Sequence, residues 1–282
     1  MKNVLNTDLT GKVAVVTGAG GVLCSQFAAV LARAGAKVAL LDINEEAAAA
    51  VAQAICEEGG TARAYRCDVL SAGTCRQVAD QVQSDLGPCD ILINGAGGNN
   101  PRATTDKEYY FEGDLDAEVK SFFDLDADGV SFVFNLNFLG TLLPTQAFAR
   151  QMLGRPGCNI LNISSMNAFT PLTKIPAYSG AKAAISNFTQ WLAVHFSKAG
   201  IRVNAIAPGF FVTKQNEKLL FDDDGNPTPR TGKILAATPM GRFGKAEELS
   251  GAVLFLLNNE AASFITGVVL PIDGGFSAYS GV

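Results

Sequence analysis

Residues 163–184, ISSMNAFTPLTKIPAYSGAKAA, contain three side chains that suit proton transfer: Ser165, Tyr178 and Lys182. Tyr178 and Lys182 are four residues apart, so they share one face of any helix that contains both. A free phenol has a pKa of about 10, and acid–base work near pH 7 needs a shift of roughly three units, or ~4 kcal/mol. A nearby ammonium favours the phenolate, and the Ser165 hydroxyl can hydrogen-bond a substrate oxygen. The alternative is an ordinary pair on a solvated helix face.

The segment TGAGGVLC, residues 17–24, is a second candidate site. It lies between the first predicted strand and the first predicted helix, where glycines let backbone N–H groups approach a pyrophosphate. Asp42 ends the next predicted strand, and a carboxylate there accepts hydrogen bonds from an adenosine ribose and repels a 2′-phosphate. Its neighbours Asn44, Glu45 and Glu46 offer no cation, which favours NAD over NADP. A glycine turn without a ligand and a helix-capping Asp42 are the alternatives.

Short β-branched runs alternate with Ala-rich helical patterns along the whole chain. The predicted strands are 12–18, 37–43, 62–69, 89–97, 158–165, 201–209 and 268–275, and the predicted helices include 25–35, 45–60, 74–87 and 178–197. These strands are almost continuously apolar, which is typical of parallel strands covered by helices on both faces. The pattern therefore predicts an α/β fold, a single domain over 1–282 with a doubly wound, Rossmann-like parallel sheet.

Two polar segments, about 98–131 and 210–245, interrupt this alternation. Both follow the carboxyl ends of predicted strands, and open α/β sheets bind their ligands at that edge. Long excursions at this edge are usually lids or specificity loops. We therefore expect both segments to lie over an active site.

The composition argues against several function classes. The chain has 282 residues, of which 48% are apolar and 17% are charged, enough for a large core. Its net charge of −5 argues against nucleic acid or an anionic membrane as a partner. There is no apolar run of about 18 residues, and the N-terminus does not resemble a signal peptide. The six cysteines are scattered, as is typical of reduced thiols, so we expect a cytoplasmic protein.

No metal site is expected. Asp124, Asp126 and Asp128 match the opening of a calcium loop, but the position that needs a bidentate glutamate holds Asn135. The only histidine, His195, has no second histidine with which to bind a metal.

Nearly the whole chain resembles the short-chain dehydrogenase/reductase family. The resemblance is carried by TGAGGVLC, Asp42, CDV (67–69), NGAG (94–97), NFLG (137–140), ISS (163–165), YSGAK (178–182), PGFFVT (208–213) and DGG (273–275). It implies an NAD-dependent oxidoreductase with Tyr178 as general acid–base and with Lys182 lowering the pKa of Tyr178 and holding the ribose. It also implies that Ser165 orients the substrate carbonyl and that Asn137 supports a proton relay.

The same resemblance implies an NAD site in which Asp68 contacts adenine and Thr213 contacts the nicotinamide or pyrophosphate end. The implied cofactor-binding residues are Gly18, Gly20, Gly21, Val22, Leu23, Asp42, Asp68, Val69, Asn94, Ala96, Gly97, Tyr178, Lys182, Pro208, Gly209, Phe211 and Thr213. The chain departs from the family at this site. Val22 and Cys24 stand where the family's turn has glycines, and Gly95 replaces the second Asn of N-N-A-G.

Four segments are similar to one branch of the family, the D-mannonate oxidoreductases or fructuronate reductases, which interconvert D-mannonate and D-fructuronate with NAD(H). They are 95–105, 136–146, 164–179 and 273–282. Arg102 and Lys174 are expected at the pocket mouth, where a guanidinium suits a carboxylate by bidentate hydrogen bonding. Asn167 is expected to bind substrate hydroxyls.

Two alternatives remain at this stage. One is gluconate 5-dehydrogenase or another polyol or ketone reductase, and the other is a non-catalytic NAD-binding regulatory protein. The family resemblance also implies a homo-oligomer, with a tetramer favoured, and a small-molecule substrate as the partner rather than nucleic acid or a membrane.

Overall fold

The computed structural model describes residues 6–212, 220–222 and 226–281. Within these residues seven strands form one sheet in the order β3-β2-β1-β4-β5-β6-β7. The strands are β1 (Val13–Thr17), β2 (Lys37–Asp42), β3 (Thr61–Arg66), β4 (Ile91–Asn94), β5 (Asn159–Ile163), β6 (Arg202–Pro208) and β7 (Val269–Ile272). Every neighbouring pair is parallel, which confirms the predicted Rossmann-like fold.

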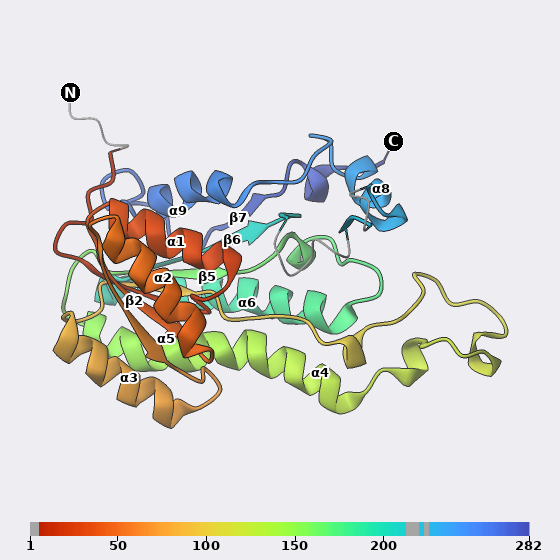
Figure 1. The fold of residues 1–282 in the computed structure, drawn as a ribbon, viewed down its shortest axis with the longest axis horizontal. Helices are drawn as coiled ribbons and strands as arrows, with labels where there is room; N and C mark the ends of the chain where they lie inside the picture. Colours follow the sequence, from red (N-terminus) through yellow and green to blue (C-terminus); the bar gives the residue numbers. More distant parts are fainter. Residues whose placement is uncertain (1–5, 213–219, 223–225, 282) are drawn as a thin grey trace.

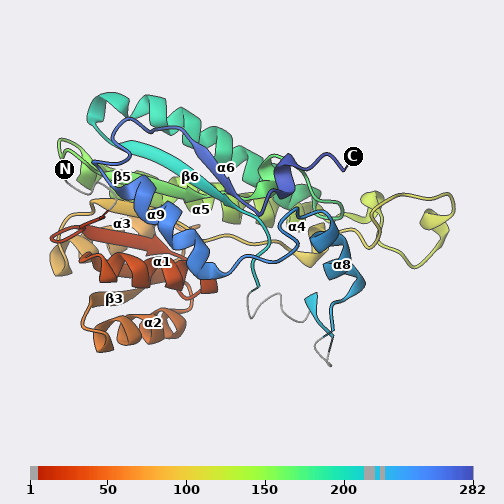
Figure 2. The same cartoon turned by 90° about the horizontal axis from the view of Figure 1, so that it is seen from above.

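Helices cover both faces of this sheet (Figures 1 and 2). The helices of the described residues are α1 (Val22–Arg33), α2 (Glu45–Glu57), α3 (Ala72–Asp85), α4 (Ala127–Phe134), α5 (Gly140–Met152), α6 (Pro176–His195), α8 (Pro229–Ala236) and α9 (Ser250–Leu257), of which α8 lies beyond the sheet. Helices α1, α2 and α9 pack in one hydrophobic cluster, and α3, α5 and α6 pack in the other. None of the helices in the described part of the chain is long and apolar enough to span a membrane.

Strands β1, β4 and β5 are buried along their whole length because helices cover both of their faces. The chain runs outward from β1 to β2 and β3 on one side, and from β4 to β7 on the other. The order therefore reverses between β1 and β4. In open α/β sheets this switch point, at the carboxyl ends of the strands, is where ligands bind.

Side-chain caps fix where the helices next to this edge begin. Asn44 accepts a hydrogen bond from the N–H of Ala47 at the start of α2. Asp126 accepts one from Gly129 at the start of α4, at 2.6 Å. Such caps satisfy amides that have no partner within the helix. Helix α4, a π-helical turn (Asn135–Leu139) and α5 then follow one another without a break.

The two predicted insertions follow the carboxyl ends of β4 and β6. The first contains three short 3₁₀ turns and the start of α4, and its middle projects beyond the body of the protein (Figures 1 and 2). The second contains α8 and includes the undescribed ranges. An ion pair of 2.8 Å between Glu108 and Lys233 joins the two insertions.

Candidate active site

Helix α6 presents Tyr178 and Lys182 one turn apart beside the carboxyl end of β5. The helix begins at Pro176, a position where a missing N–H is harmless. The Nζ atom of Lys182 lies 5.5 Å from the centre of the Tyr178 ring. Ser165, which follows β5, forms a side-chain hydrogen bond with Tyr178. The structure therefore brings together three of the four predicted catalytic side chains.

Lys182 is buried, with 4% of its surface exposed. Its Nζ donates a hydrogen bond of 2.8 Å to the carbonyl of Ile163, the last residue of β5. Burial lowers the pKa of Lys182 to about 8, an effect that the nearby Cys24 opposes. The side chain is therefore mainly an ammonium at neutral pH, and the β5 carbonyl fixes its position.

Burial sets the acidity of the Tyr178 phenol in the protein alone. Burial raises the pKa of Tyr178 to about 12, and the hydrogen bond with Ser165 only partly opposes this rise. That Lys182 and a bound nicotinamide together lower this pKa stays a prediction, because desolvation of the phenolate is the largest influence in the protein alone. The phenol therefore keeps its proton at neutral pH and can act as a proton donor.

Asn137, the fourth predicted catalytic residue, lies in the π-helical turn and is completely buried. Its Nδ2 donates to the carbonyls of Gly98 and Val133, both at 2.8 Å, and its Oδ1 accepts from the N–H of Gly98 at 3.3 Å. A Cβ atom on Gly97 would lie 2.6 Å from Asn137 Oδ1 and 3.3 Å from Lys182 Nζ. Glycine at 97 is what lets the Asn137 amide and the Lys182 ammonium approach the same backbone segment.

The glycine-rich turn packs closely against neighbouring segments of the protein. Gly18 has a φ of +67°, and a Cβ there would lie 2.9 Å from the backbone of Ala96. A Cβ on Gly20 would lie 2.7 Å from the Cβ of Ala47 and 3.2 Å from Asp42 Oδ2. That oxygen accepts the Gly20 N–H at 2.9 Å. The turn and the carboxylate at the end of β2 thus fit the pyrophosphate and ribose of a dinucleotide.

Asp42 does not cap α2. Its Oδ1 accepts the N–H of Asn44, and the Asn44 side chain is the N-cap of that helix. Around the same turn, the N–H of Gly21 donates to the carbonyl of Gly18 at 3.0 Å. Val22 begins α1 and is 36% exposed. Leu23 follows it and packs partly buried against the core.

Cys24 and Gly95 both depart from the family pattern, and the two differences compensate each other. Cys24 on α1 is 5% exposed, and a Cβ on Gly95 would collide with its Sγ atom. The N–H groups of Gly95 and Ala96 both donate to Thr17 Oγ1, at 3.0 and 3.2 Å. The Cys24 side chain therefore fills the space that a side chain at position 95 would need. The sequence contained both differences but gave no sign that they were linked.

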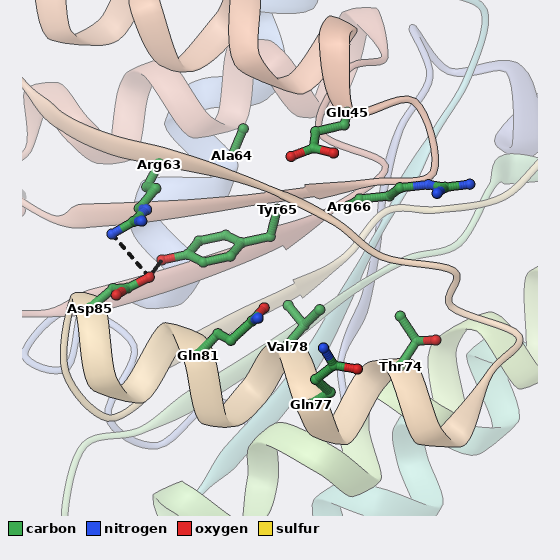
Figure 3. A pocket seen from close by; sticks show the side chains of 10 residues that line it. All are labelled: Glu45, Arg63, Ala64, Tyr65, Arg66, Thr74, Gln77, Val78, Gln81 and Asp85. Carbon is green, nitrogen blue, oxygen red and sulfur yellow. Dashed lines mark hydrogen bonds and ion pairs between the residues drawn. The ribbon is translucent and has the colours of Figure 1, made fainter.

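Strand β3 supplies a cation near Asp42 that sequence reasoning missed. Arg66 is the register partner of Asp42 across the β2–β3 pair. A polar cavity of about 510 Å³ lies between β3 and α3 (Figure 3). In it the Tyr65 hydroxyl donates a hydrogen bond to Asp85, and Arg63 forms an ion pair with the same carboxylate. Arg66 points away from that group and toward the carboxyl end of β3. The residues next to Arg66 in the sequence did not reveal that Arg66 pairs with Asp42, because strand register is a tertiary feature.

The remaining cofactor residues near β3 and β4 line the same edge. Asp68 Oδ1 accepts the N–H of Leu70 at 2.9 Å. Val69 packs closely against Gly140, because a Cβ atom on that glycine would lie 3.1 Å from Val69 Cγ2. The Nδ2 of Asn94 donates to Thr145 Oγ1 and to Asn162 Oδ1, both at 2.9 Å, whereas its buried Oδ1 has no protein partner.

The end of β6 forms the other side of the predicted cofactor site. Pro208 is the last residue of the strand, and the Gly209 N–H donates to the carbonyl of Ile272 at 2.9 Å. A Cβ on Gly209 would lie 2.6 Å from the Cα of Asp273. Phe211 is 6% exposed. Thr213 lies outside the described residues.

Two of the predicted substrate residues are engaged with protein groups. The Arg102 guanidinium contacts Asp126 at 2.8 Å and Asp128 at 3.9 Å. Lys174 has a φ of +73°, the only positive value on a non-glycine residue in the described ranges. Its carbonyl accepts the N–H of Thr105 at 2.9 Å, which ties the loop before α6 to the first insertion. Neither contact tests a role in substrate binding.

Asn167, the third predicted substrate residue, is 4% exposed and lies two residues after Ser165. Its N–H donates to Ser165 Oγ at 3.3 Å, and its Oδ1 is buried without a hydrogen-bond partner. Buried acceptors are rarely left unpaired. Asn167 therefore carries a buried, unused acceptor on a residue whose backbone N–H is bound to Ser165 Oγ.

His195 stacks on Trp191 with 4.6 Å between ring centres and an angle of 13°. Across the described part of the chain, no three His, Cys, Asp or Glu side chains are grouped so that they could hold a metal ion. All six cysteines have free thiols.

Known proteins match this chain over most of its length. The family model for short chain dehydrogenase matches residues 12–223. A Haemophilus influenzae protein named as an uncharacterized oxidoreductase is 63% identical over 282 residues, covering 100% of this chain and 99% of its own. A Haemophilus influenzae structure with bound NAD, proposed as a D-mannonate oxidoreductase, superposes with a TM-score of 0.95, at 63% identity and 100% coverage of both chains. A Burkholderia cenocepacia gluconate 5-dehydrogenase with NADP and tartrate gives 0.83, at 30% identity and coverage of 99% and 100%.

Proposed function

The chain belongs to the short-chain dehydrogenase/reductase family, and from that premise we propose that it uses NAD to interconvert D-mannonate and D-fructuronate. An NAD(P)-dependent oxidoreductase activity follows from the family and from the bound NAD of the similar structure. The observation that carries the proposal is the Tyr178 phenol, hydrogen-bonded to Ser165 and one helical turn from Lys182. This group lies at the sheet edge where the Gly18 to Gly20 turn suits a dinucleotide.

The bound nicotinamide supplies the hydride chemistry, and the protein supplies orientation and the proton. Ser165 holds the substrate oxygen beside Tyr178. In the reductive direction, the Tyr178 hydroxyl gives its proton to the oxygen of the former ketone as that oxygen becomes an alkoxide. In the oxidative direction Tyr178 must first lose its proton, which the nearby Lys182 ammonium and the positive charge of the oxidised nicotinamide favour, and the phenolate then accepts the proton of the alcohol. A phenol is a stronger acid than an alcohol, so proton transfer from Tyr178 to an alkoxide is favourable in the reductive direction.

The preference for NAD is supported by Asp42. Its carboxylate faces the glycine turn and accepts the Gly20 N–H, where it would repel a 2′-phosphate. Arg66 on β3 is the group that would oppose this preference. The preference between the two coenzymes is tested by measuring the dissociation constants of NADH and NADPH from the change in their fluorescence on binding. Tighter binding of NADPH would reject the choice of NAD.

A sugar acid as substrate is supported by the similar proteins and by the polar groups near Ser165. Both the proposed D-mannonate oxidoreductase and the gluconate 5-dehydrogenase are named for sugar acids. Asn167, two residues after Ser165, offers a buried acceptor without a protein partner that suits a substrate hydroxyl. Arg102 lies on a short turn after β4 and would exchange Asp126 for the substrate carboxylate. The gluconate 5-dehydrogenase likeness makes gluconate the second candidate.

The test is a panel of sugar acids and neutral polyols with NAD and NADP, followed by the absorbance of the reduced nicotinamide. We expect the highest kcat/KM with D-mannonate or D-fructuronate. Tyr178→Phe should lose at least a hundredfold in kcat while keeping its affinity for NADH. Tyr279→Phe, which removes an exposed phenol elsewhere, is the matched control. Full activity of Tyr178→Phe would reject the mechanism, and NAD binding without turnover of any panel member would favour a regulatory protein.

Arg102→Ala separates the substrate role from a structural one. Loss of a carboxylate partner should raise KM for a sugar acid far more than KM for a neutral polyol. Equal effects on both would mean that Arg102 serves only to hold Asp126 at the start of α4. We further propose that the enzyme is cytoplasmic and homo-oligomeric, with a tetramer expected from sedimentation analysis.

A further inference from the structure

Three consecutive residues at the end of β5 contact the catalytic part of α6, each in a different way. The carbonyl of Ile163 accepts the Lys182 ammonium at 2.8 Å, and Ser165 forms a hydrogen bond with Tyr178. Between these two residues, the Ser164 hydroxyl lies 3.1 Å from the backbone carbonyl of Lys182. Of the three contacts, that of Ser164 reaches the helix backbone, and no step of the proposed reaction uses it.

Ser164 shares this carbonyl with a second serine, Ser186, one turn further along α6. Ser164 is buried, with 2% of its surface exposed. The two hydroxyl oxygens lie 2.7 Å apart, and Ser186 Oγ lies 3.2 Å from the same Lys182 carbonyl. Each hydroxyl has a single proton to donate. When one proton serves the contact between the two serines, the other therefore serves the Lys182 carbonyl.

A contact to the helix backbone restrains α6 more tightly than a contact to a side chain. The four-carbon stem of Lys182 is flexible, so its ammonium can stay on the Ile163 carbonyl while the helix moves. The backbone carbonyl of Lys182, by contrast, moves only with the helix. The Ser164 hydroxyl therefore fixes where the helical turn from Tyr178 to Lys182 lies along the end of β5.

A second buried contact joins β5 and α6 further from the active site. The Nδ2 of Asn162 donates to Thr189 Oγ1 at 2.9 Å, and both side chains are completely buried. At 1.5 Å per residue, Thr189 lies about 16 Å along α6 from Tyr178, whereas Lys182 lies about 6 Å from it. If the Ser164 contact is removed, the contact at Thr189 is too distant to hold the Tyr178 end of α6 in place.

We propose that Ser164 is a positioning residue that holds α6 at the height that places Tyr178 beside Ser165. It acts through the backbone of Lys182 and takes no part in the proton transfer itself. A displacement of about 1 Å at a reacting group can cost a hundredfold in rate. This role rests on the proton transfer by Tyr178 proposed above, whichever sugar acid is the substrate.

Ser164→Ala and Ser186→Ala form a matched pair, because each deletes one hydroxyl and leaves the other on the Lys182 carbonyl. In Ser186→Ala the contact between Ser164 and α6 persists, whereas in Ser164→Ala only a contact within α6 remains. Both variants should lower Tm by a similar amount, roughly 2–4 °C. Only Ser164→Ala should also lower kcat, by at least tenfold, while its KM and its dissociation constant for NADH stay within threefold of the wild-type values.

The rates are measured with the sugar acid that the wild type turns over best. A best substrate other than D-mannonate or D-fructuronate would reject the proposed substrate and leave this comparison intact. Equal kcat values in Ser164→Ala and Ser186→Ala would overturn the positioning role, and so would a loss in Ser164→Ala that is confined to KM.

Crystal structures of the two variants give a readout that needs no substrate. In Ser164→Ala the Tyr178 hydroxyl should lie beyond hydrogen-bonding distance of Ser165, more than about 3.5 Å away, whereas in Ser186→Ala it should keep its place. An unmoved Tyr178 in Ser164→Ala would overturn the proposal. A displaced Tyr178 with wild-type kcat would reject the proton transfer by Tyr178, and the positioning role with it.

Discussion

The contact between Cys24 and position 95 gives a sharp test of how the cofactor turn is built. In Gly95→Ala the new Cβ would collide with Cys24 Sγ and lie 2.9 Å from the Thr17 carbonyl. Overpacking of this kind in a buried site costs about 1–3 kcal/mol. Cys24→Ala removes the sulfur and leaves its own Cβ at 3.7 Å from the new atom, an ordinary contact. The Gly95→Ala penalty should therefore fall by at least ~1 kcal/mol in the Cys24→Ala background.

The assay is a double-mutant cycle read by thermal unfolding. A difference of 1 kcal/mol corresponds to roughly 2–4 °C in Tm for a protein of this size. Cys24→Ala alone should cost about 1 kcal/mol because it leaves a small cavity. The double variant should then unfold at a higher temperature than the sum of the two single changes predicts. If Gly95→Ala lowers Tm equally in both backgrounds, the sulfur is not what excludes a side chain at position 95.

Three further predictions follow from the same geometry. Burial holds the pKa of Lys182 at about 8 rather than 10.5, so between these pH values the unfolded chain binds the extra proton and the free energy of unfolding rises with pH. Lys182→Met should remove up to ~3 kcal/mol of this rise in the free energy of unfolding. The prediction would be contradicted if urea unfolding gave the same pH dependence of that free energy for the wild type and the variant. Gly97→Ala should lower kcat/KM at least a hundredfold because its Cβ would displace the Asn137 amide. The control Gly98→Ala, whose Cβ would meet only Leu136 at 3.7 Å, should keep kcat/KM within threefold of the wild-type value. Similar losses of kcat/KM in both variants would remove the special role of Gly97. Asp42→Ala should raise the ratio of NADPH affinity to NADH affinity at least tenfold, and a second substitution, Arg66→Ala, should reverse this gain. If the ratio stayed constant, Asp42 would not determine the choice of coenzyme.

Local patterns in the sequence were enough to predict the fold and to place Tyr178 and Lys182 on one face of a helix. Near-continuous apolar runs predicted a parallel sheet because only a sheet covered on both faces buries every residue of a strand. The spacing of Tyr178 and Lys182 predicted a shared helix face because the helical period is a local property. The glycines after β1 predicted a turn that a cofactor can approach, and in the structure Gly18 and Gly20 occupy positions where a side chain would meet neighbouring protein atoms.

The pKa of Tyr178 in the protein alone could not be predicted from its spacing to Lys182. Sequence spacing gives the distance to Lys182 but says nothing of how much water the phenol loses. The structure shows that desolvation dominates, with a pKa of about 12, and that the Lys182 ammonium is bound to the carbonyl of Ile163. Burial depends on every element packed around the site, so it is not encoded in a window of four residues.

By itself, then, this sequence determined which residues form strands and helices, which side chains share a face, and where glycine is needed, because each of these depends on near neighbours in the chain. The tertiary structure alone decided that Cys24 occupies the space beside Gly95, that Arg66 stands next to Asp42, and that Arg102 contacts Asp126. It also decided that the middle of the first insertion projects beyond the body of the protein. These contacts join residues that lie on different elements, and their partners are set by strand register and packing rather than by local spacing.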